Sequence, residues 1–217
     1  NYIRYIGAGA VATGGIISLI KSLPMIVKSF KDSINDLKSR DSSSNGDRLD
    51  TDISFKVSII LIIVSVILIF LMPSTPVNII GAIIIVVFGF FFATVSSRMV
   101  GIIGSSNNPV SGMSIATLLI ATLILKATGL VGHDGMIAAI SIGTIICVIA
   151  AIAGDCSQDL KTGYIVGASP KYQQIGEIIG VLTSSLVIGG ILWILNTSIG
   201  FGTKDLPAPQ AVLMKMI

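Results

Sequence analysis

Long apolar runs separated by short polar segments make up most of the chain. Uncharged stretches cover residues 5–20, 57–97, 99–125, 135–154 and 178–203. A membrane-spanning helix needs about 20 predominantly apolar residues, and most of these stretches are long enough. The runs lack the period-two alternation of a membrane β-barrel, and an open sheet edge in lipid would leave backbone groups without hydrogen bonds. The pattern therefore predicts an all-α, polytopic membrane protein.

The longest run contains the sequence PSTP at 73–76, where two closely spaced prolines favour a turn over a continuing helix. Dividing the run there predicts about six transmembrane helices. They are expected at residues 3–27, 55–72, 77–98, 109–127, 135–153 and 174–197. Between the first two, residues 35–53 are rich in serine and in charges of both signs, which predicts a flexible linker.

Basic residues are unevenly distributed over the connections between these helices. If the connections alternate sides, loops 28–54, 98–108 and 154–173 lie on one side of the membrane. With their flanks they contain Lys21, Lys28, Lys31, Lys38, Arg40, Arg48, Lys56, Arg98, Lys161 and Lys171. The other side contains Lys126 and Lys204, with Arg4 and Lys215 at the chain ends. By the positive-inside rule, the three loops are expected to be cytoplasmic.

The composition agrees with a membrane protein and indicates which kinds of partner the chain binds. The chain is 53% hydrophobic and 12% charged, whereas about 25% charged residues are usual in soluble domains. The net charge of +3 is small and clusters at segment ends, so a lipid bilayer is the expected partner and nucleic acid is not. Cys147 and Cys156 have neither metal-ligand nor disulfide-framework spacing, so no metal or cofactor is expected.

One polar segment, GDCSQDLKTGYIVGASP at 154–170, interrupts the apolar pattern. Asp155 and Gln158 have the spacing of a capping box, and Gly163 suits a helix end, so a short helix at 156–162 is a purely structural interpretation.

That short helix leaves Asp159, Lys161 and Tyr164 unexplained, because two aspartates at positions 155 and 159 of one helix repel each other. Ionisable residues at a membrane mark ion and substrate pathways. A functional interpretation of the segment therefore stays open beside the structural one. Glu177, one turn into the last expected span, either reaches the interface or titrates within the membrane, and both readings stay open.

A second polar segment, SSRMVGIIGSSNNPVSGM at 96–113, separates two apolar runs. Asn108 and Pro109 suit the N-cap and first position of a helix. The small and amide residues around them predict a broken or re-entrant helix near 99–112. In secondary transporters, helix ends of this kind hold anionic substrate groups such as carboxylates.

Four polar segments resemble one protein family in the same order. AGDCSQDLKTGYIVGASPKYQQIGEIIG at 153–180 closely resembles the signature segment of the oligopeptide transporter family, which includes the yellow-stripe-like carriers of metal chelates. RYIGAGAVATGGIISLIKSLP at 4–24, the segment at 96–113 and LPAPQAVLMK at 206–215 are similar to further segments of its prokaryotic members.

The resemblance implies a proton-coupled carrier of peptides or metal chelates in the cell membrane, built from two related halves. The chain starts with Asn1 and ends within an apolar run, so it is expected to be an internal piece of a larger membrane protein. The resemblance implies that this piece belongs to the later half. Its expected partners are a small peptide or metal-chelate substrate, protons, and the remaining half of the same transporter.

The residues form two hypothetical functional groups. The expected substrate-binding residues are Asn107, Asn108, Ser111, Gly112, Gln158 and Tyr164. The expected proton-coupling or gating residues are Asp155, Asp159, Lys161 and Glu177.

Other functional classes have less support in the residues. The sequence lacks the catalytic motifs of an intramembrane enzyme, because it contains neither HExxH nor GxSxG and has one histidine. No catalytic residue is therefore expected. A non-transporting membrane scaffold and a passive channel remain alternatives.

Overall fold

The chain folds into antiparallel helices. The computed structural model describes residues 48–208 except 73, 74, 76, 106 and 107, together with scattered positions between 6 and 28. In order, the described elements are η2 (Arg48–Asp50), α2 (Phe55–Leu71), α3 (Ile79–Ile103), α4 (Val110–Ala127), α5 (Gly132–Val166) and α6 (Pro170–Ser198). This part of the chain contains no strand, which confirms the all-α prediction. Much of the helix expected at 3–27 lies outside the described residues. So does most of the linker expected at 35–53.

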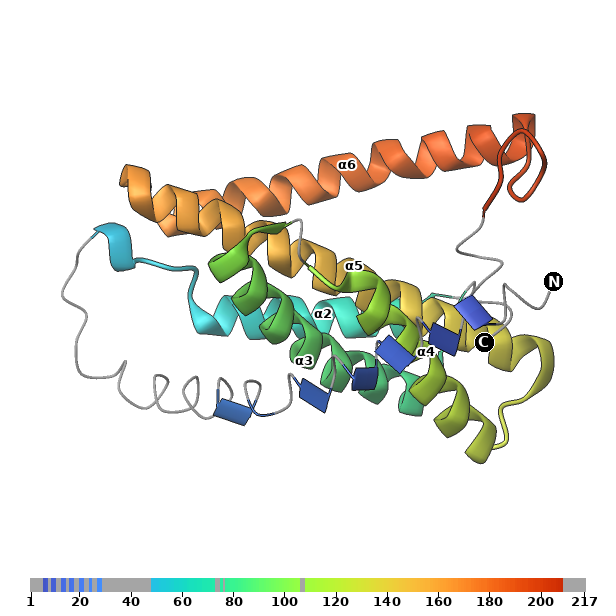
Figure 1. The fold of residues 1–217 in the computed structure, drawn as a ribbon. Coiled ribbons are helices and arrows are strands. Elements are labelled where there is room, and N and C mark those ends of the chain that lie inside the picture. Colours follow the sequence, from blue (N-terminus) through green and yellow to red (C-terminus); the bar gives the residue numbers. More distant parts are fainter. Residues whose placement is uncertain are drawn as a thin grey trace.

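Four of these helices are long and apolar enough to cross a membrane. They are α3, α4, α5 and α6, while α2 is apolar but shorter. Successive helices run in opposite directions (Figure 1), so their connections fall alternately at two ends of the bundle. Among the lysines and arginines of 48–208, Lys126 and Lys204 belong to one end. Arg48, Lys56, Arg98, Lys161 and Lys171 belong to the other, which is called the basic end below.

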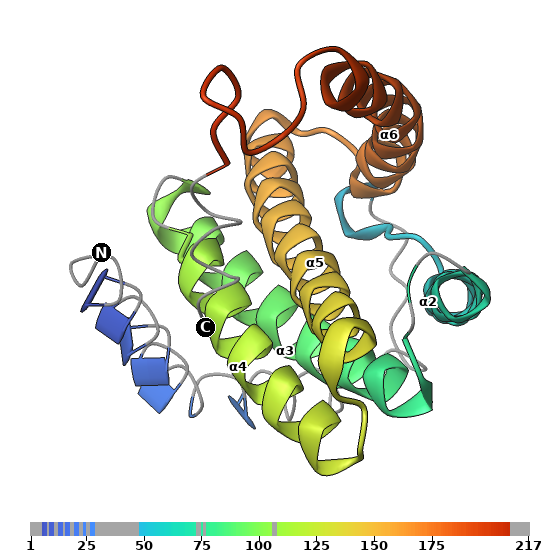
Figure 2. The ribbon, with the colours of Figure 1, turned by 90° about the vertical axis from the view of Figure 1, so that its right-hand side faces the viewer.

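The packed core lies between α3, α4 and α5. Phe92 of α3, Leu125 of α4 and Ile142 of α5 are almost completely buried there. Small residues allow the helices to approach closely, which is how helices associate in lipid: Gly89 faces Ile149, and a Cβ added to it would lie 3.0 Å from the Ile149 Cδ1 atom. Viewed along the helices, α2 and α6 lie on the side of α5 away from α4 (Figure 2). None of the residues of α6 is buried.

Helix α5 extends much further than the apolar run that predicts it. The short helix expected at 156–162 is wrong, because α5 continues without a break through this segment to Val166. No proline occurs between residues 154 and 166, so no residue there breaks the helix. The helix ends at Gly167, which has a φ of 78° in the left-handed region that favours glycine. The loop expected at 154–173 is therefore reduced to a turn at 167–169.

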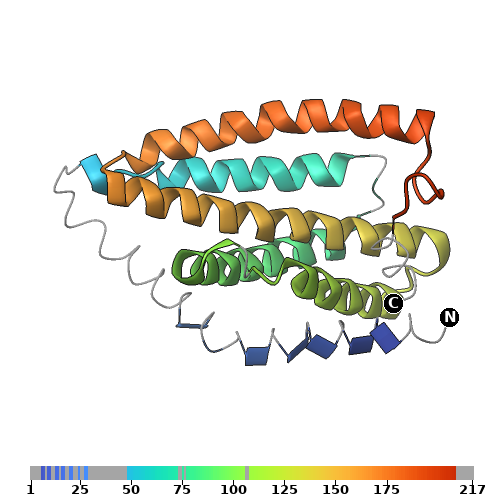
Figure 3. The ribbon, with the colours of Figure 1, turned by 45° about the horizontal axis from the view of Figure 1, so that its top comes forward.

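Residues 48–54 are held against the turn between α5 and α6, where η2 lies in Figure 3. The Arg48 side chain donates a hydrogen bond to the Gly167 carbonyl oxygen at 2.7 Å. The Lys171 backbone N–H donates to the Thr51 carbonyl oxygen at 3.0 Å. The Ile53 N–H donates to the Gln174 Oε1 atom at 2.9 Å. These bonds link the start of α2 to the turn, although the two are far apart in sequence.

Replacing Arg48 with alanine should loosen this contact without unfolding the bundle. One exposed hydrogen bond contributes about 0.5–1.5 kcal/mol, so the effect should be local. We expect faster amide hydrogen exchange in residues 167–174 and unchanged exchange in α3. Lys204→Ala, which removes a cation at the other end, is the control. Equal exchange at 167–174 in both variants would contradict the prediction.

Candidate functional site

The connection between α3 and α4 is a short helix break, here defined as residues 104–109. It is shorter than the loop expected at 98–108, because α3 continues to Ile103. Gly104 ends α3 with a φ of 102°, a conformation that other residues rarely adopt. Helix α4 begins at Val110, and no side chain caps its first turn. Asn107 lies outside the described residues.

Asn108, which belongs to the break, forms hydrogen bonds to α3 and α5. Its side-chain Nδ2 donates to the Ser96 Oγ atom of α3 at 2.7 Å and to the Ala150 carbonyl oxygen of α5 at 3.3 Å. The fully buried Ser96 hydroxyl donates to the same Ala150 oxygen at 2.5 Å. Asn108 therefore does not cap α4 as the sequence suggested, because its amide is used between helices. Its Oδ1 atom is buried and has no hydrogen-bond partner among the described residues.

One face of α5 is shaped to receive the break. Gly154 is buried, and a Cβ added there would lie 2.6 Å from the Asn108 Nδ2 atom. One turn further on, the Ser157 hydroxyl donates to the Ser97 carbonyl oxygen of α3 at 2.6 Å. Gln158 accepts a hydrogen bond from the Ser105 backbone N–H at 3.2 Å. The positions three and four residues apart form one helix face, so this face of α5 holds α3 and the break together.

The opposite face of α5 meets the start of α6. Glu177 of α6 lies beside Cys156 and Asp159 of α5. The Gln173 side chain donates to the Asp159 carbonyl oxygen at 3.2 Å and fills the space beside Gly163, where a Cβ would overlap it. The Glu177 Oε1 atom is buried and lacks a partner in the described part of the chain. Two carboxyl groups thus meet between two membrane-spanning helices; Asp159 and Glu177 are called the acidic pair below.

The expected site residues separate into these two clusters and a set of exposed side chains. Asn108 belongs to the break and Gln158 contacts it, while Asp159 and Glu177 meet on the other side of α5. The remaining described residues are Ser111, Asp155, Lys161 and Tyr164, which are exposed like Gln158 and Asp159, and Gly112, which is half-buried. The structure therefore does not gather the nine described residues around one point.

Several polar groups at these contacts escape sequence reasoning. Ser96 and Ser157 have no feature in sequence that distinguishes them from the other serines, and their role depends on the contact between helices. Gly154 also escapes sequence reasoning, although a glycine is needed there to leave room for Asn108. Gly163, expected to end a helix, lies inside α5 instead and leaves room for Gln173. Cys156 received no chemistry from its sequence context, yet it lies beside Glu177. Within the described residues, no group of three or more His, Cys, Asp or Glu side chains is placed to hold a metal ion.

Apolar spanning helices, a helix break bonded to its neighbours and a carboxyl pair between two helices define a multi-pass membrane protein with polar contacts between its helices. The chain belongs to the OPT oligopeptide transporter family, whose model matches residues 1–217. This is a family of transporters and not of enzymes, and it confirms the family resemblance seen in the sequence.

Relatives from bacteria, plants and yeast match different shares of the chain. A Haemophilus influenzae protein named for oligopeptide transport is 33% identical over 247 residues, covering 99% of this chain and 39% of that protein. A rice protein named for metal-nicotianamine transport is 30% identical over 88 residues, covering 39% of this chain and 12% of its own. A Saccharomyces cerevisiae protein named for oligopeptide transport is 29% identical over 72% of this chain and covers 21% of its own length. No solved structure matches the chain.

The contact between Asn108 and Gly154 can be tested by a double-mutant cycle. Interhelical hydrogen bonds in membranes contribute about 0.6 kcal/mol on average and up to about 1.7 kcal/mol each. Asn108→Ala should therefore lower the free energy of unfolding by about 1–3 kcal/mol, measured by denaturation in detergent. Gly154→Ala should cost a similar amount, because the new Cβ displaces the Asn108 amide.

The double variant should have nearly the same free energy of unfolding as either single variant, since the two substitutions remove the same contact. Gly180→Ala is the matched control, because an added Cβ there meets no atom within 4 Å. If Gly154→Ala leaves the protein as stable as the Gly180→Ala variant, the contact does not have this role.

Proposed function

We propose that this chain is part of a secondary active transporter that moves small peptides or metal chelates together with protons. It would work with the remaining part of the carrier, because it spans about 39% of the length of its Haemophilus influenzae relative. Its assignment to the later half rests on the family resemblance of its polar segments. The names of its relatives support both substrate classes, as they refer to oligopeptides and to metal-nicotianamine. The single observation that carries the coupling proposal is the acidic pair between α5 and α6.

The acidic pair provides a chemical basis for proton coupling. Two neighbouring carboxylates repel each other when both are charged, and one proton bound between them removes the repulsion. Ionisable groups within membrane spans are costly and commonly form proton relays. Binding of a proton would remove the repulsion and stabilise the contact of α6 with α5. Release of the proton would restore the repulsion and separate the two helices. Asp155, exposed on α5, would add negative charge beside the pair. Lys161 is also exposed, on the other side of α5, and would act only at longer range.

The break provides a basis for substrate binding. The uncapped first turn of α4 presents backbone N–H groups and the positive end of a helix dipole to an anionic group. Ser111 and Gly112 lie in that turn, and Asn107 precedes it. The unpaired Asn108 Oδ1 atom could accept a peptide N–H, which would satisfy a buried polar group. Gln158, which already contacts the break, and Tyr164 would add polar contacts along α5.

Glu177→Gln tests the coupling role directly. The amide keeps the shape of the side chain but cannot bind or release a proton. In proteoliposomes containing the full-length protein, uptake driven by an inward pH gradient should fall by about tenfold or more. Exchange of substrate at equal pH on both sides should persist, because it needs no net proton movement. Candidate substrates are short peptides and metal chelates, screened first with the unmodified protein.

Asp134→Asn is the control, since it removes an exposed carboxylate from the far end of α5. Gradient-driven uptake by the Glu177→Gln variant at the level of this control would overturn the coupling proposal. Flux through the unmodified protein that neither saturates nor responds to the gradient would indicate a passive channel instead. Absence of any flux would favour a scaffold.

A further inference from the structure

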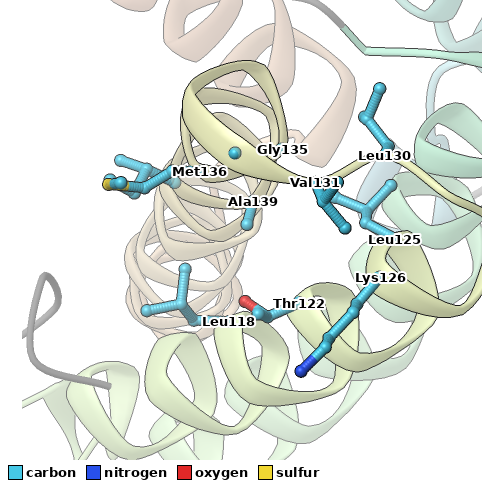
Figure 4. A pocket seen from close by; sticks show the side chains of 11 residues that line it. Leu118, Thr122, Leu125, Lys126, Leu130, Val131, Gly135, Met136 and Ala139 are labelled. Atoms are coloured by element: carbon cyan, nitrogen blue, oxygen red, sulfur yellow. The ribbon is translucent and has the colours of Figure 1, made fainter.

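A cavity opens between α4 and α5 at the end of the bundle opposite the basic end. Its volume is about 310 Å³, near the lower limit of the roughly 300–1,000 Å³ usual for small-molecule sites. Its walls are mainly apolar, with Leu118 and Leu125 from α4 facing Met136 and Ala139 from α5 (Figure 4). It lies far from the break and from the acidic pair, at the other end of α5.

Two polar side chains line the cavity, Thr122 and Lys126, and both come from the C-terminal part of α4. Lys126, in the last turn of α4, is the one charged residue among those that line it. Val131 and Gly132, where α5 begins, lie at the same end. No side chain caps that helix start, so its first N–H groups carry partial positive charge. Asp134 follows in the same turn, but it does not line the cavity.

The cavity extends from the ends of the helices toward the middle of the bundle. From Lys126 to Leu118 on α4, and from Gly132 to Ile140 on α5, the lining residues span eight positions. At 1.5 Å per residue this is about 12 Å, which is less than half of the roughly 30 Å hydrocarbon core. The cationic end therefore lies toward the membrane surface, and the apolar end lies within one leaflet.

We propose that this cavity binds an anionic phospholipid of the leaflet opposite the basic end. An acyl chain occupies the apolar part between α4 and α5. The phosphate lies at the rim, where the Lys126 ammonium group and the first N–H groups of α5 attract it. A cation near an anionic headgroup and an apolar wall along the tail together select a lipid that is both negatively charged and inserted in the bilayer.

Native mass spectrometry of the full-length protein can test this site, with phosphatidylglycerol compared with phosphatidylcholine. We expect the unmodified protein to bind phosphatidylglycerol more tightly. Lys126→Gln should weaken phosphatidylglycerol binding by about fivefold and leave phosphatidylcholine binding nearly unchanged. Met136→Trp, which fills the apolar part, should weaken the binding of both lipids.

Two matched controls separate the site from general effects of charge and bulk. Lys204→Gln removes a cation at the same end of the bundle but outside the cavity, and Val148→Trp adds a ring to an exposed part of α5 away from it. Both should bind lipid like the unmodified protein. Equal binding of the two lipids, or Lys126→Gln binding like Lys204→Gln, would overturn the proposal. Tighter binding of a free fatty acid than of phosphatidylglycerol would also overturn it, because the occupant would then be a different lipid.

Discussion

The hydrogen bonds of Asn108 hold together the part of the structure on which the candidate site depends. A chain that leaves one membrane helix and enters another exposes backbone groups that lipid cannot satisfy. Asn108 joins this connection to Ser96 and to the Ala150 carbonyl oxygen, so the break packs against protein. The contact is possible because position 154 is a glycine, whose missing side chain leaves the space that the amide occupies. Gly104 ends α3, and Gly154 on α5 leaves room for the amide that holds the following break in place.

Helix α5 separates two kinds of polar chemistry that the sequence presents as a single segment. Gly154 and Ser157 face α3 and the break, whereas Cys156 and Asp159 face α6. Because these residues alternate along one helix, the two faces are connected directly through α5. In the proposed transporter, this helix would link substrate binding at the break to protonation of the acidic pair.

Much of the fold follows from hydropathy, and much of the site does not. Apolar run length and the prolines at 73 and 76 predict the helices, because lipid leaves the backbone no other way to satisfy its hydrogen bonds. The extension of α5 to Val166 escapes the same reasoning, since polar residues such as Gln158 and Lys161 end an apolar run without ending a helix. The partners of Asn108 and Glu177 come from neighbouring helices, so only the packed structure reveals them.

The length of α5 also determines where the acidic pair lies relative to water. Its 35 residues extend about 52 Å, whereas the hydrocarbon core is about 30 Å thick. A helix this long must emerge from the bilayer on at least one side or tilt strongly. If the emerging end is the one that contains Asp159, the proposed acidic pair lies near the aqueous phase, and a proton would reach it without crossing the low-dielectric interior.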